Sequence, residues 1–384
     1  MTPGLGTGSR GLRIFRWIAA GLAMCLAIGS IAAYLKFRSV WDSIVRVPLT
    51  GLGAAPPKLS SAMNVLLIGS DSRSGPNRKF GAGIQGQRSD TIIILHIQPH
   101  HGGIIALSIP RDSVVPVLSC PTEAGAPGQA SQPGQVEQLN ATFAAGGPGC
   151  LWKTVEQTTH LHLDHFIELN FTGFEKVIND VGGVSICLPF AVNDPDSRLR
   201  LSSGRHHVGG AEALAFWRAR YLGEGSDLQR IRRDQYLMAS LLQGVEHSGL
   251  TASPARILSV VTDAAGSMTT DSRLSLPAMI SIADSLRRLP PGGVQFVELP
   301  TQAYGPNPNW VTWPASDLAL FRGIALDRPV SPAGGRTSKA VADTHGRDAT
   351  RTRGATLARS YGGITGKTNV CNDRAAFYGP LGGS

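Results

Sequence analysis

Short apolar runs bounded by glycine and polar residues predict a series of strands in this chain of 384 residues. The expected strands cover residues 64–68, 91–97, 104–109, 167–171, 184–188 and 294–299. Runs with helical spacing alternate with them and predict helices at residues 151–159, 172–181, 210–220, 226–249, 254–265, 276–288 and 315–324. Strands and helices mixed in this order predict one α/β (α+β) domain rather than two separate domains.

One apolar run stands apart from this pattern because it is much longer. Residues 17–35 carry no charge and are numerous enough to span a bilayer as a helix, which predicts a transmembrane signal-anchor. Arg10, Arg13 and Arg16 precede the run, which favours a cytoplasmic tail over residues 1–16. A cleaved signal peptide is the alternative, but the run exceeds the usual length and no small-residue cleavage site follows directly. The remaining chain is therefore expected outside the cytoplasm, in a single-pass protein of the cell membrane.

The rest of the chain divides by composition. Residues 36–62 are interrupted by proline and glycine and predict a linker. Residues 63–328 contain the predicted strands and helices and form the expected folded domain. Residues 329–384 are rich in Arg, Thr, Ala, Gly and Ser, which predicts a low-complexity, poorly ordered tail.

Charge and cysteine content add two constraints. The formal net charge of +9 favours a polyanionic partner, which is a nucleic acid, an anionic membrane surface or a phosphorylated substrate. Four cysteines, Cys120, Cys150, Cys187 and Cys371, follow the apolar run, and in an oxidising compartment they allow two disulfides in three pairings. Cys120 and Cys150 enclose a loop rich in Gly and Pro that a disulfide would restrain, and a Cys187–Cys371 pair follows only by elimination.

Charged residues follow or precede the first three predicted strands. The strands at 91–97 and 104–109 are joined by a short turn, so an antiparallel hairpin is expected. This hairpin would bring Arg111 and Asp112 back to the edge where Arg88 and Asp90 enter the sheet. Asp71 joins them if the first strand ends at the same edge. Paired carboxylates can hold a hard cation that also bridges phosphates, whereas the alternative is a set of surface ion pairs of little energetic consequence.

A second group of arginines lies within residues 216–235, which comprise the end of one predicted helix and the start of the next. The group consists of Arg218, Arg220, Arg230, Arg232 and Arg233. Arginine suits phosphate because its charge is permanent and its planar fork of donors binds oxygens in pairs. A helix start carrying arginines is a candidate phosphate site, with a solvated charged face as the alternative. Arg232 lies off the stripe formed by the others and is expected at the surface.

Histidines alternate at positions 160, 162 and 165. Alternating histidines are possible metal ligands, but no carboxylate or cysteine with matching spacing accompanies them. The beginning of an ordinary half-exposed strand is the preferred interpretation.

Taken together, the motifs resemble the LytR-CpsA-Psr family of bacterial cell-wall enzymes, and the composition is typical of an actinobacterial member. The matching pieces, in order, are Asn64-Val-Leu-Leu-Ile-Gly-Ser-Asp71-Ser-Arg73, Arg88-Ser-Asp90-Thr, Ser108-Ile-Pro-Arg111-Asp112, Leu139-Asn140 with Gly146-Gly147, Asp180-Val-Gly-Gly-Val184, Gly209-Gly-Ala-Glu-Ala-Leu214, Arg218-Ala-Arg220 and Asp227-Leu-Gln-Arg230-Ile-Arg-Arg233. Each motif alone is unspecific, whereas the ordered set is specific.

The resemblance implies a central mixed sheet flanked by helices, with a hydrophobic channel for a lipid. It also implies a transferase that moves a glycopolymer from a polyprenyl-pyrophosphate carrier onto peptidoglycan and releases polyprenyl phosphate. The residues that the resemblance implies for binding pyrophosphate are Arg88, Arg111, Arg218, Arg220, Arg230 and Arg233. Asp71 and Asp90 would hold Mg²⁺ or Mn²⁺, and Asp112 and Asp227 would orient arginines. Asp90, Arg111 and Asp71 are the expected catalytic residues, since Asp90 and Asp71 are candidate bases by elimination.

Two other functions use the same residues. A pyrophosphatase would act on the same lipid with water as the acceptor, and a non-catalytic lipid-binding or regulatory protein, similar to a transcriptional attenuator, would need no reaction. Nucleic acid is not an expected partner because the arginines follow the membrane anchor and no helix-turn-helix pattern is present. One position departs from the family pattern. Asp234 stands where the family often has glutamine, and a carboxylate there would repel phosphate unless an arginine pairs with it.

Overall fold

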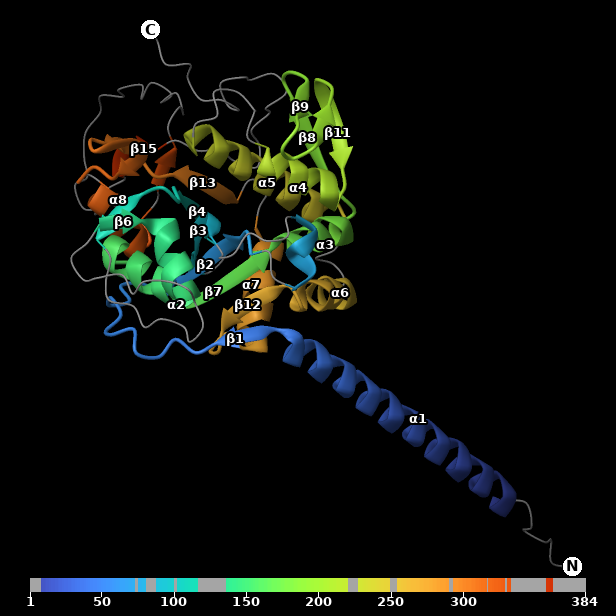
Figure 1. Cartoon of the computed structure of the whole chain (residues 1–384). Coiled ribbons are helices and arrows are strands. Elements are labelled where there is room, and N and C mark those ends of the chain that lie inside the picture. Colours follow the sequence, from blue (N-terminus) through green and yellow to red (C-terminus); the bar gives the residue numbers. More distant parts are fainter. Residues whose placement is uncertain are drawn as a thin grey trace, which may run out of the picture. The chain divides into compact units, whose positions relative to one another are not determined.

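The structure, a computed structural model, describes residues 8–72, 75–80, 88–99, 102–116, 136–219, 227–248, 254–289, 293–315, 317–328, 330–332 and 357–361. The helices are α1 (Gly8–Ser43), the 3₁₀ helix η1 (Gly75–Phe80), α2 (Leu139–Thr159), α3 (Phe171–Val181), α4 (Gly210–Arg218), α5 (Asp227–His247), α6 (Pro254–Ala265), α7 (Leu276–Arg287) and α8 (Asp317–Ala325). Figure 1 shows the strands among these helices.

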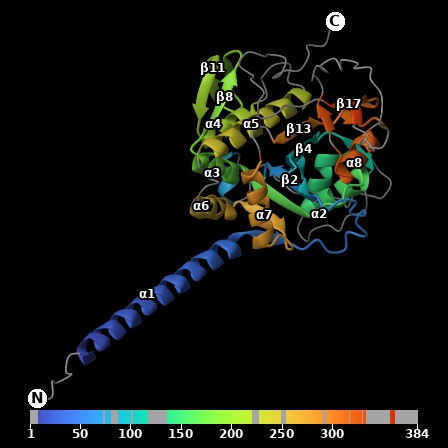
Figure 2. The ribbon, with the colours of Figure 1, turned by 180° about the vertical axis from the view of Figure 1, so that it is seen from behind.

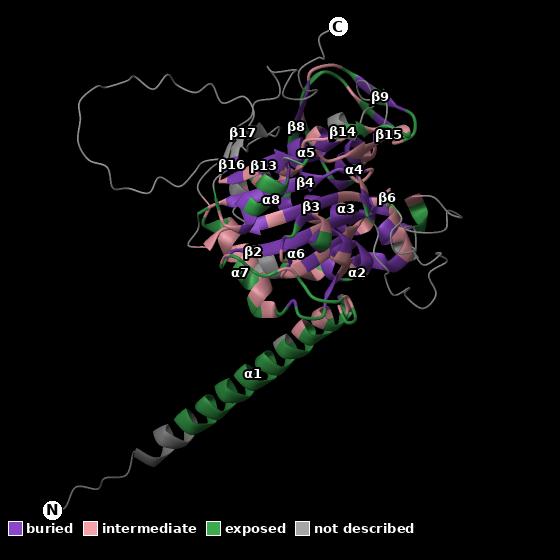
Figure 3. Cartoon of the chain, turned by 90° about the vertical axis from the view of Figure 1, so that its left-hand side faces the viewer, coloured by how far each residue is buried: buried purple, intermediate pink, exposed green. Residues whose placement is uncertain are grey.

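The N-terminal unit consists of one long helix. Within Phe15–Ser43 of α1, a stretch of 18 residues has a mean hydropathy of 2.1, and by length and composition this helix could cross a membrane. Its described side chains are exposed almost throughout, as Figure 3 shows in green. The helix extends past the predicted anchor at residue 35 and includes the first residues of the predicted linker, because no proline or glycine interrupts residues 36–43.

The remaining chain folds around a seven-stranded mixed sheet with the order β1-β12-β7-β2-β3-β4-β13. Strand β2 pairs antiparallel with β3 and parallel with β7, and β13 pairs parallel with β4. The strands of this sheet are β1 (Val45–Val47), β2 (Met63–Ser70), β3 (Ser89–Ile97), β4 (Ile104–Ile109), β7 (His165–Asn170), β12 (Met268–Asp271) and β13 (Val294–Glu298). The predicted mixed sheet flanked by helices is therefore confirmed.

Alternation along the central strands divides the core between the two faces of the sheet. Val65 of β2 contacts one hydrophobic cluster, whereas Leu66 and Ile68 belong to the other. The first cluster includes apolar side chains of α3, α4 and α5, and the second includes those of α2 and α8. These helices cover opposite faces of the sheet in Figures 1 and 2, and the buried strands between them are purple in Figure 3. Ile93 of β3 is buried in the first cluster and Ile94 in the second. Both faces of the central strands are therefore covered, which explains why these strands read as continuous apolar runs.

Short strand pairs surround the sheet. They are β5 (Val114–Pro116) with β6 (Val136–Gln138), β8 (Val184–Leu188) with β11 (Gly204–Val208), β9 (Val192–Asp194) with β10 (Leu199–Leu201), β14 (Gln302–Tyr304) with β15 (Asn307–Thr312), and β16 (Val330–Pro332) with β17 (Leu357–Tyr361). Strands β9, β10 and β11 were not predicted, because the sequence there is polar. Strands β16 and β17 lie within the predicted poorly ordered tail, so the structure differs from the prediction at these residues.

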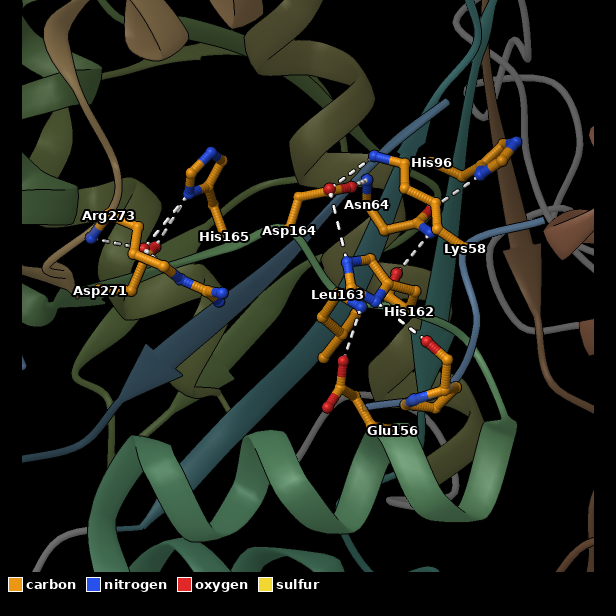
Figure 4. A network of polar contacts seen from close by, with 11 residues as sticks. Lys58, Asn64, His96, Glu156, His162, Leu163, Asp164, His165, Asp271 and Arg273 are labelled. Atoms are coloured by element: carbon orange, nitrogen blue, oxygen red, sulfur yellow. Dashed lines mark hydrogen bonds and ion pairs between the residues drawn. The ribbon is translucent and has the colours of Figure 1, made fainter. Parts of the chain in front are cut away.

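The histidine-rich segment before β7 belongs to a polar network, shown in Figure 4. The Asp164 carboxylate accepts hydrogen bonds from Lys58 Nζ (2.6 Å) and from the Asn64 backbone N–H (2.8 Å). His162 and His165 have separate partners, since His162 Nδ1 lies 3.1 Å from the Pro56 carbonyl oxygen and His165 Nδ1 lies 3.2 Å from Asp271. No cluster of metal-ligating side chains is found among the described residues. These hydrogen bonds connect the segment to neighbouring parts of the fold, and β7 begins at His165.

Of the cysteines after α1, two lie in the described part of the chain. Cys150 in α2 and Cys187 in β8 are buried, and both are disulfide-bonded. Their expected partners, Cys120 and Cys371, lie outside the described residues, so the pairings stay predictions.

Candidate functional site

The strand register brings the charged ends of β2, β3 and β4 to one edge of the sheet. Ser70 at the end of β2 pairs with Ser89 at the start of β3, and Ile92 of β3 pairs with Ile109 at the end of β4. The residues just outside these strands must therefore meet. Asp71 and Arg88 do so through two hydrogen bonds, from the Asp71 N–H to the Arg88 carbonyl oxygen (3.0 Å) and from the Arg88 N–H to Asp71 Oδ1 (2.7 Å). The predicted convergence at this edge is confirmed.

Asp90 is the centre of an arginine pair. Arg111 donates to Asp90 Oδ1, and Arg230 Nη2 lies 3.3 Å from Asp90 Oδ2. The three side chains are only 15–22% exposed, so water screens these ion pairs less than at an open surface. Each carboxylate oxygen thus holds a different guanidinium, and the one carboxylate fixes both arginines at the rim of the sheet.

The turn after β4 is held by the start of α2. Asp112 Oδ1 accepts hydrogen bonds from Gln138 Nε2 (2.7 Å) and from Asn140 Nδ2 (3.4 Å). The Asn140 N–H also donates to the Arg111 carbonyl oxygen at 3.0 Å. Asp112 Oδ2 lies 3.5 Å from Arg111 Nε, whereas Asp90 contacts Nη1 of the same guanidinium. This geometry is consistent with the supporting role predicted for Asp112.

Arg218, the last residue of α4, lies against two aromatic rings. Its guanidinium carbon is 5.1 Å from the ring centroid of Phe171 and 5.7 Å from that of Phe80, and the two rings contact each other edge to face. Both distances lie within the range of cation–π attraction. Phe171 begins α3, whose first turn is capped by the Asn170 side chain through the Gly173 N–H. The start of one helix therefore supports the arginine at the end of another.

These side chains line one cavity of about 430 Å³. Its described lining consists of Asp71, Arg88, Asp90, Arg111, Asp112, Gln138, Asn140, Phe171, Asp196, Arg218 and Arg230. Seven predicted site residues are brought together here. They come from the strand ends and from helices α4 and α5, which lie far from those strands in the sequence. Because four arginines face four aspartates, the formal charges of the described lining balance before any ligand binds.

Three predicted site residues are not among them. Arg220 and the side chain of Asp227 lie outside the described residues. Arg233 is 4% exposed, and its Nη2 donates to the Ala219 carbonyl oxygen at 2.7 Å. The structure therefore places Arg233 behind the cavity, where it fixes the extended residue that follows α4. Arg233 is on the buried side of α5. Helical spacing in the sequence could not show which side of the helix is buried.

Asp234 also lies behind the cavity. Its carboxyl is buried and accepts a hydrogen bond from Thr91 Oγ1 at 3.2 Å. Burial raises the pKa of Asp234 to about 6, and the charges of Arg230 and Arg233 partly oppose this increase. The position that departs from the family pattern thus pairs electrostatically with arginines rather than facing phosphate.

A second, much smaller cavity of about 20 Å³ shares Asp90, Arg111 and Arg230 with the first. Its lining includes Asp234 and the isoleucines Ile92, Ile93, Ile109 and Ile231. Apolar surface is therefore present immediately beside the arginine pair.

The structure also adds and corrects residues. Gln138, Phe171 and Asp196 line the cavity but were not predicted, because amide, phenyl and hairpin carboxylate side chains carry no local signal of a site. Asn140 was part of a matched motif without an assigned role. Arg232, expected at the surface, instead forms a 3.0 Å ion pair with Glu298, which is 5% exposed. The prediction that Arg232 lies at the surface was wrong, because Glu298 of β13 lies on that side of α5.

The donor set of the cavity fits a divalent cation only in part. Asp71 and Asp90 both line it, and Mg²⁺ is commonly bound by one or two carboxylates together with substrate phosphates. Among the described residues no group of three or more metal-ligating side chains is found. The described lining therefore provides no complete protein cage, but it offers two carboxylates of the kind that Mg²⁺ shares with a phosphorylated substrate.

A mixed α/β fold with four arginines and four aspartates converging at strand ends places an ionic site at the rim of the sheet. The sequence matches the LytR_cpsA_psr family over residues 49–318. The chain belongs to the LytR-CpsA-Psr family.

Similar proteins agree with this assignment. The probable cell wall biosynthesis protein LcpB of Corynebacterium glutamicum is 33% identical over 65% of this chain, and the chain spans 57% of that protein's length. The polyisoprenyl-teichoic acid–peptidoglycan teichoic acid transferase TagU of Bacillus cereus is 26% identical over 62% of this chain and 74% of its own length. The LytR-Csp2A-Psr enzyme of Actinomyces oris, a solved structure, has the same fold, with a TM-score of 0.55 at 20% identity, covering 73% of this chain and 96% of that chain.

Proposed function

We propose that this protein is a membrane-anchored phosphotransferase that moves a glycopolymer from a polyprenyl-pyrophosphate carrier onto peptidoglycan outside the cytoplasm. The observation that carries the proposal is the convergence of Arg88, Arg111, Arg218 and Arg230 on one cavity. Four permanent charges in a partly buried site suit a pyrophosphate better than a neutral ligand. The names of the relatives, a cell wall biosynthesis protein and a teichoic acid transferase, support the same substrate class.

The arginines would bind the oxygens of both phosphates. The acceptor hydroxyl of peptidoglycan would attack the phosphorus that carries the polymer. The bridging P–O bond would then break, and polyprenyl phosphate would leave with the bonding electrons. Charge that develops on the leaving phosphate is stabilised by donors already in place, of which Arg111 and Arg230 are held by Asp90.

Mg²⁺ (or Mn²⁺) is proposed at Asp71 and Asp90. The charge balance of the described lining supports it, because a pyrophosphate adds negative charge to a cavity in which four aspartates already offset four arginines. A divalent cation shared by these carboxylates and the phosphates would supply the missing positive charge and act as a Lewis acid.

The lipid and the membrane complete the proposal. A prenyl chain would continue from the pyrophosphate, and the isoleucines beside Arg111 and Arg230 are the apolar side chains next to that position. Helix α1 is proposed to anchor the chain, with its N-terminus cytoplasmic and the remaining chain extracellular.

The test is an assay of the full chain in detergent with a polyprenyl-pyrophosphate-linked glycan, Mg²⁺ and peptidoglycan. Glycan covalently attached to peptidoglycan, with release of one polyprenyl phosphate per attachment, is expected. Release of phosphate-bearing glycan into water without attachment would instead identify a pyrophosphatase. Carrier binding without any turnover would identify a lipid-binding or regulatory protein.

A further inference from the structure

Three of the four aspartates in the cavity are held by neighbouring donors. Asp71 accepts the Arg88 N–H, and Asp90 binds two arginines. Asp112 is held by an amide from Gln138 and lies beside Arg111. The donors already occupy oxygens of these three carboxylates, so fewer of their lone pairs face a substrate in the cavity.

The fourth, Asp196, differs in its environment. It is exposed in the turn between β9 and β10, and it lines the same cavity as the arginines. Within the described part of the chain, no hydrogen bond or ion pair involves its carboxylate. This is unexpected for a carboxylate in a cavity lined by four arginines, and it leaves the oxygens of Asp196 available to a ligand.

The turn that carries Asp196 is anchored. Val192 and Leu199, on the two strands of the hairpin, are buried in the core. The fully buried Asp194 accepts the Ser197 N–H at 2.8 Å, which closes the turn around Asp196. The side chain is therefore presented at the cavity by a fixed backbone rather than by a loose loop, as general catalysis requires.

We propose that Asp196 is the general base that accepts the proton of the acceptor hydroxyl, an inference that rests on the proposed transferase function. The hydroxyl oxygen forms the new bond to the phosphorus that bears the glycan. Its proton passes to the Asp196 carboxylate, and the bridging P–O bond breaks with its electrons on polyprenyl phosphate. Every proton and electron pair is accounted for without another reactant.

The position suits a sugar hydroxyl better than a phosphate. An unneutralised carboxylate repels phosphate oxygens, so it must face an uncharged part of the bound substrates. Asp196 lies at an exposed hairpin, where an acceptor arriving from solvent would reach the cavity, whereas Asp90 and Arg230 lie at the partly buried strand edge. The cavity thus has a wall of arginines for the carrier and one carboxylate for the acceptor.

The experiment compares Asp196→Asn with wild type, Arg111→Ala and Glu212→Gln in the full chain. Glu212 is an exposed carboxylate in the first turn of α4 that does not line the cavity, so its variant is the matched control. Asp196→Asn is expected to lower the transfer rate by about 100-fold or more. It should leave binding of the polyprenyl-pyrophosphate carrier as tight as wild type or tighter, because only a repulsive charge is removed. Arg111→Ala should lose both binding and transfer.

A pH profile separates a base from a structural residue. Wild-type kcat/KM should fall on the acidic side as the base is protonated, and Asp196→Asn should lose this limb. Asp196→Glu should recover part of the rate. Asp196→Ser is a second variant without the carboxylate, and its melting temperature should equal that of wild type.

The outcomes are distinct. Transfer by Asp196→Asn within threefold of wild type, with the acidic limb intact, would overturn the inference and leave the proposed function standing. A wild-type chain that binds the carrier but attaches no glycan to peptidoglycan would overturn the proposed function and the inference with it.

Discussion

Asp90 and Arg230 form a 3.3 Å ion pair that joins the start of strand β3 to helix α5. The same carboxylate binds Arg111 at the end of β4. A single side chain therefore fixes the distance between arginines from two distant segments. Preorganised donors of this kind lose little energy to rearrangement when a pyrophosphate binds, and this is why the pair should contribute to transition-state stabilisation as well as to affinity.

Replacement of an arginine in this pair should have a large effect on activity and a small one on folding. Arg111→Ala is expected to lower kcat/KM for transfer by about 100-fold or more, because one donor to the leaving phosphate is lost. Its midpoint of urea unfolding should remain close to that of wild type. Arg322→Ala, at an exposed position of α8, is the control and should retain full activity. Normal turnover by Arg111→Ala would remove the proposed site.

The aromatic support of Arg218 can be measured by a double-mutant cycle. Phe171→Leu should weaken carrier binding by about 2- to 30-fold, which corresponds to a cation–π contact of about 0.5–2 kcal/mol. In an Arg218→Ala background the same substitution should have no further effect on binding, since the guanidinium is absent. Additive effects of the two substitutions would show that Phe171 acts independently of Arg218.

Removal of divalent cations should stop transfer. Chelation with EDTA is expected to abolish turnover, and added Mg²⁺ should restore it. Asp71→Asn should increase the Mg²⁺ concentration required for half-maximal activity by about tenfold, since one charged ligand is lost. Isothermal titration with Mg²⁺ in the presence of the carrier provides a readout independent of turnover. Unchanged activity in EDTA would argue against the metal at Asp71 and Asp90.

The buried Asp234 predicts a specific pH dependence of stability. Its pKa is raised from 3.8 to about 6 by burial, so the folded state binds the proton more tightly than the unfolded state. The resulting stabilisation is complete below pH 4 and is lost as the pH rises through 6. Asp234→Asn should therefore be more stable than wild type at pH 8, by up to about 3 kcal/mol, and similar to it at pH 4. Urea unfolding at both pH values measures this, and a constant difference would contradict it.

Two adjacent glycines at the start of α4 should differ in their tolerance of alanine. A Cβ on Gly210 would lie 2.1 Å from the Glu175 carbonyl oxygen in α3, whereas a Cβ on Gly209 would lie 3.5 Å from Asn179 Oδ1. Gly210→Ala must displace α4, which carries Arg218, and should cost about 1–3 kcal/mol of unfolding free energy and reduce transfer. Gly209→Ala, the matched control, should cost less than about 1 kcal/mol. Equal stability of the two variants would show that α4 does not require this close approach.

Several parts of the fold followed from local patterns. The β3–β4 hairpin and the end of α3 at Gly182, whose φ is 92°, were predicted from spacing and from glycine. Because strand pairing fixes which ends meet, the meeting of Asp71, Arg88 and Arg111 at one edge also followed. The long apolar run of α1 likewise needed no tertiary information, since length and composition alone predict a helix that could span a membrane.

Other features depended on which elements pack together. Arg230, Arg232 and Arg233 lie close together on α5, yet one lines the cavity, one pairs with Glu298 and one is buried against Ala219. Helical spacing gives the direction of each side chain relative to its own helix, but not the element that covers it. Asp196 reaches the cavity through a hairpin in a polar segment that predicted no strands. The sequence by itself determined the strand ends and the arginines available there. The tertiary structure decided which of them share one cavity, because long-range packing, rather than local periodicity, sets the surroundings of each side chain.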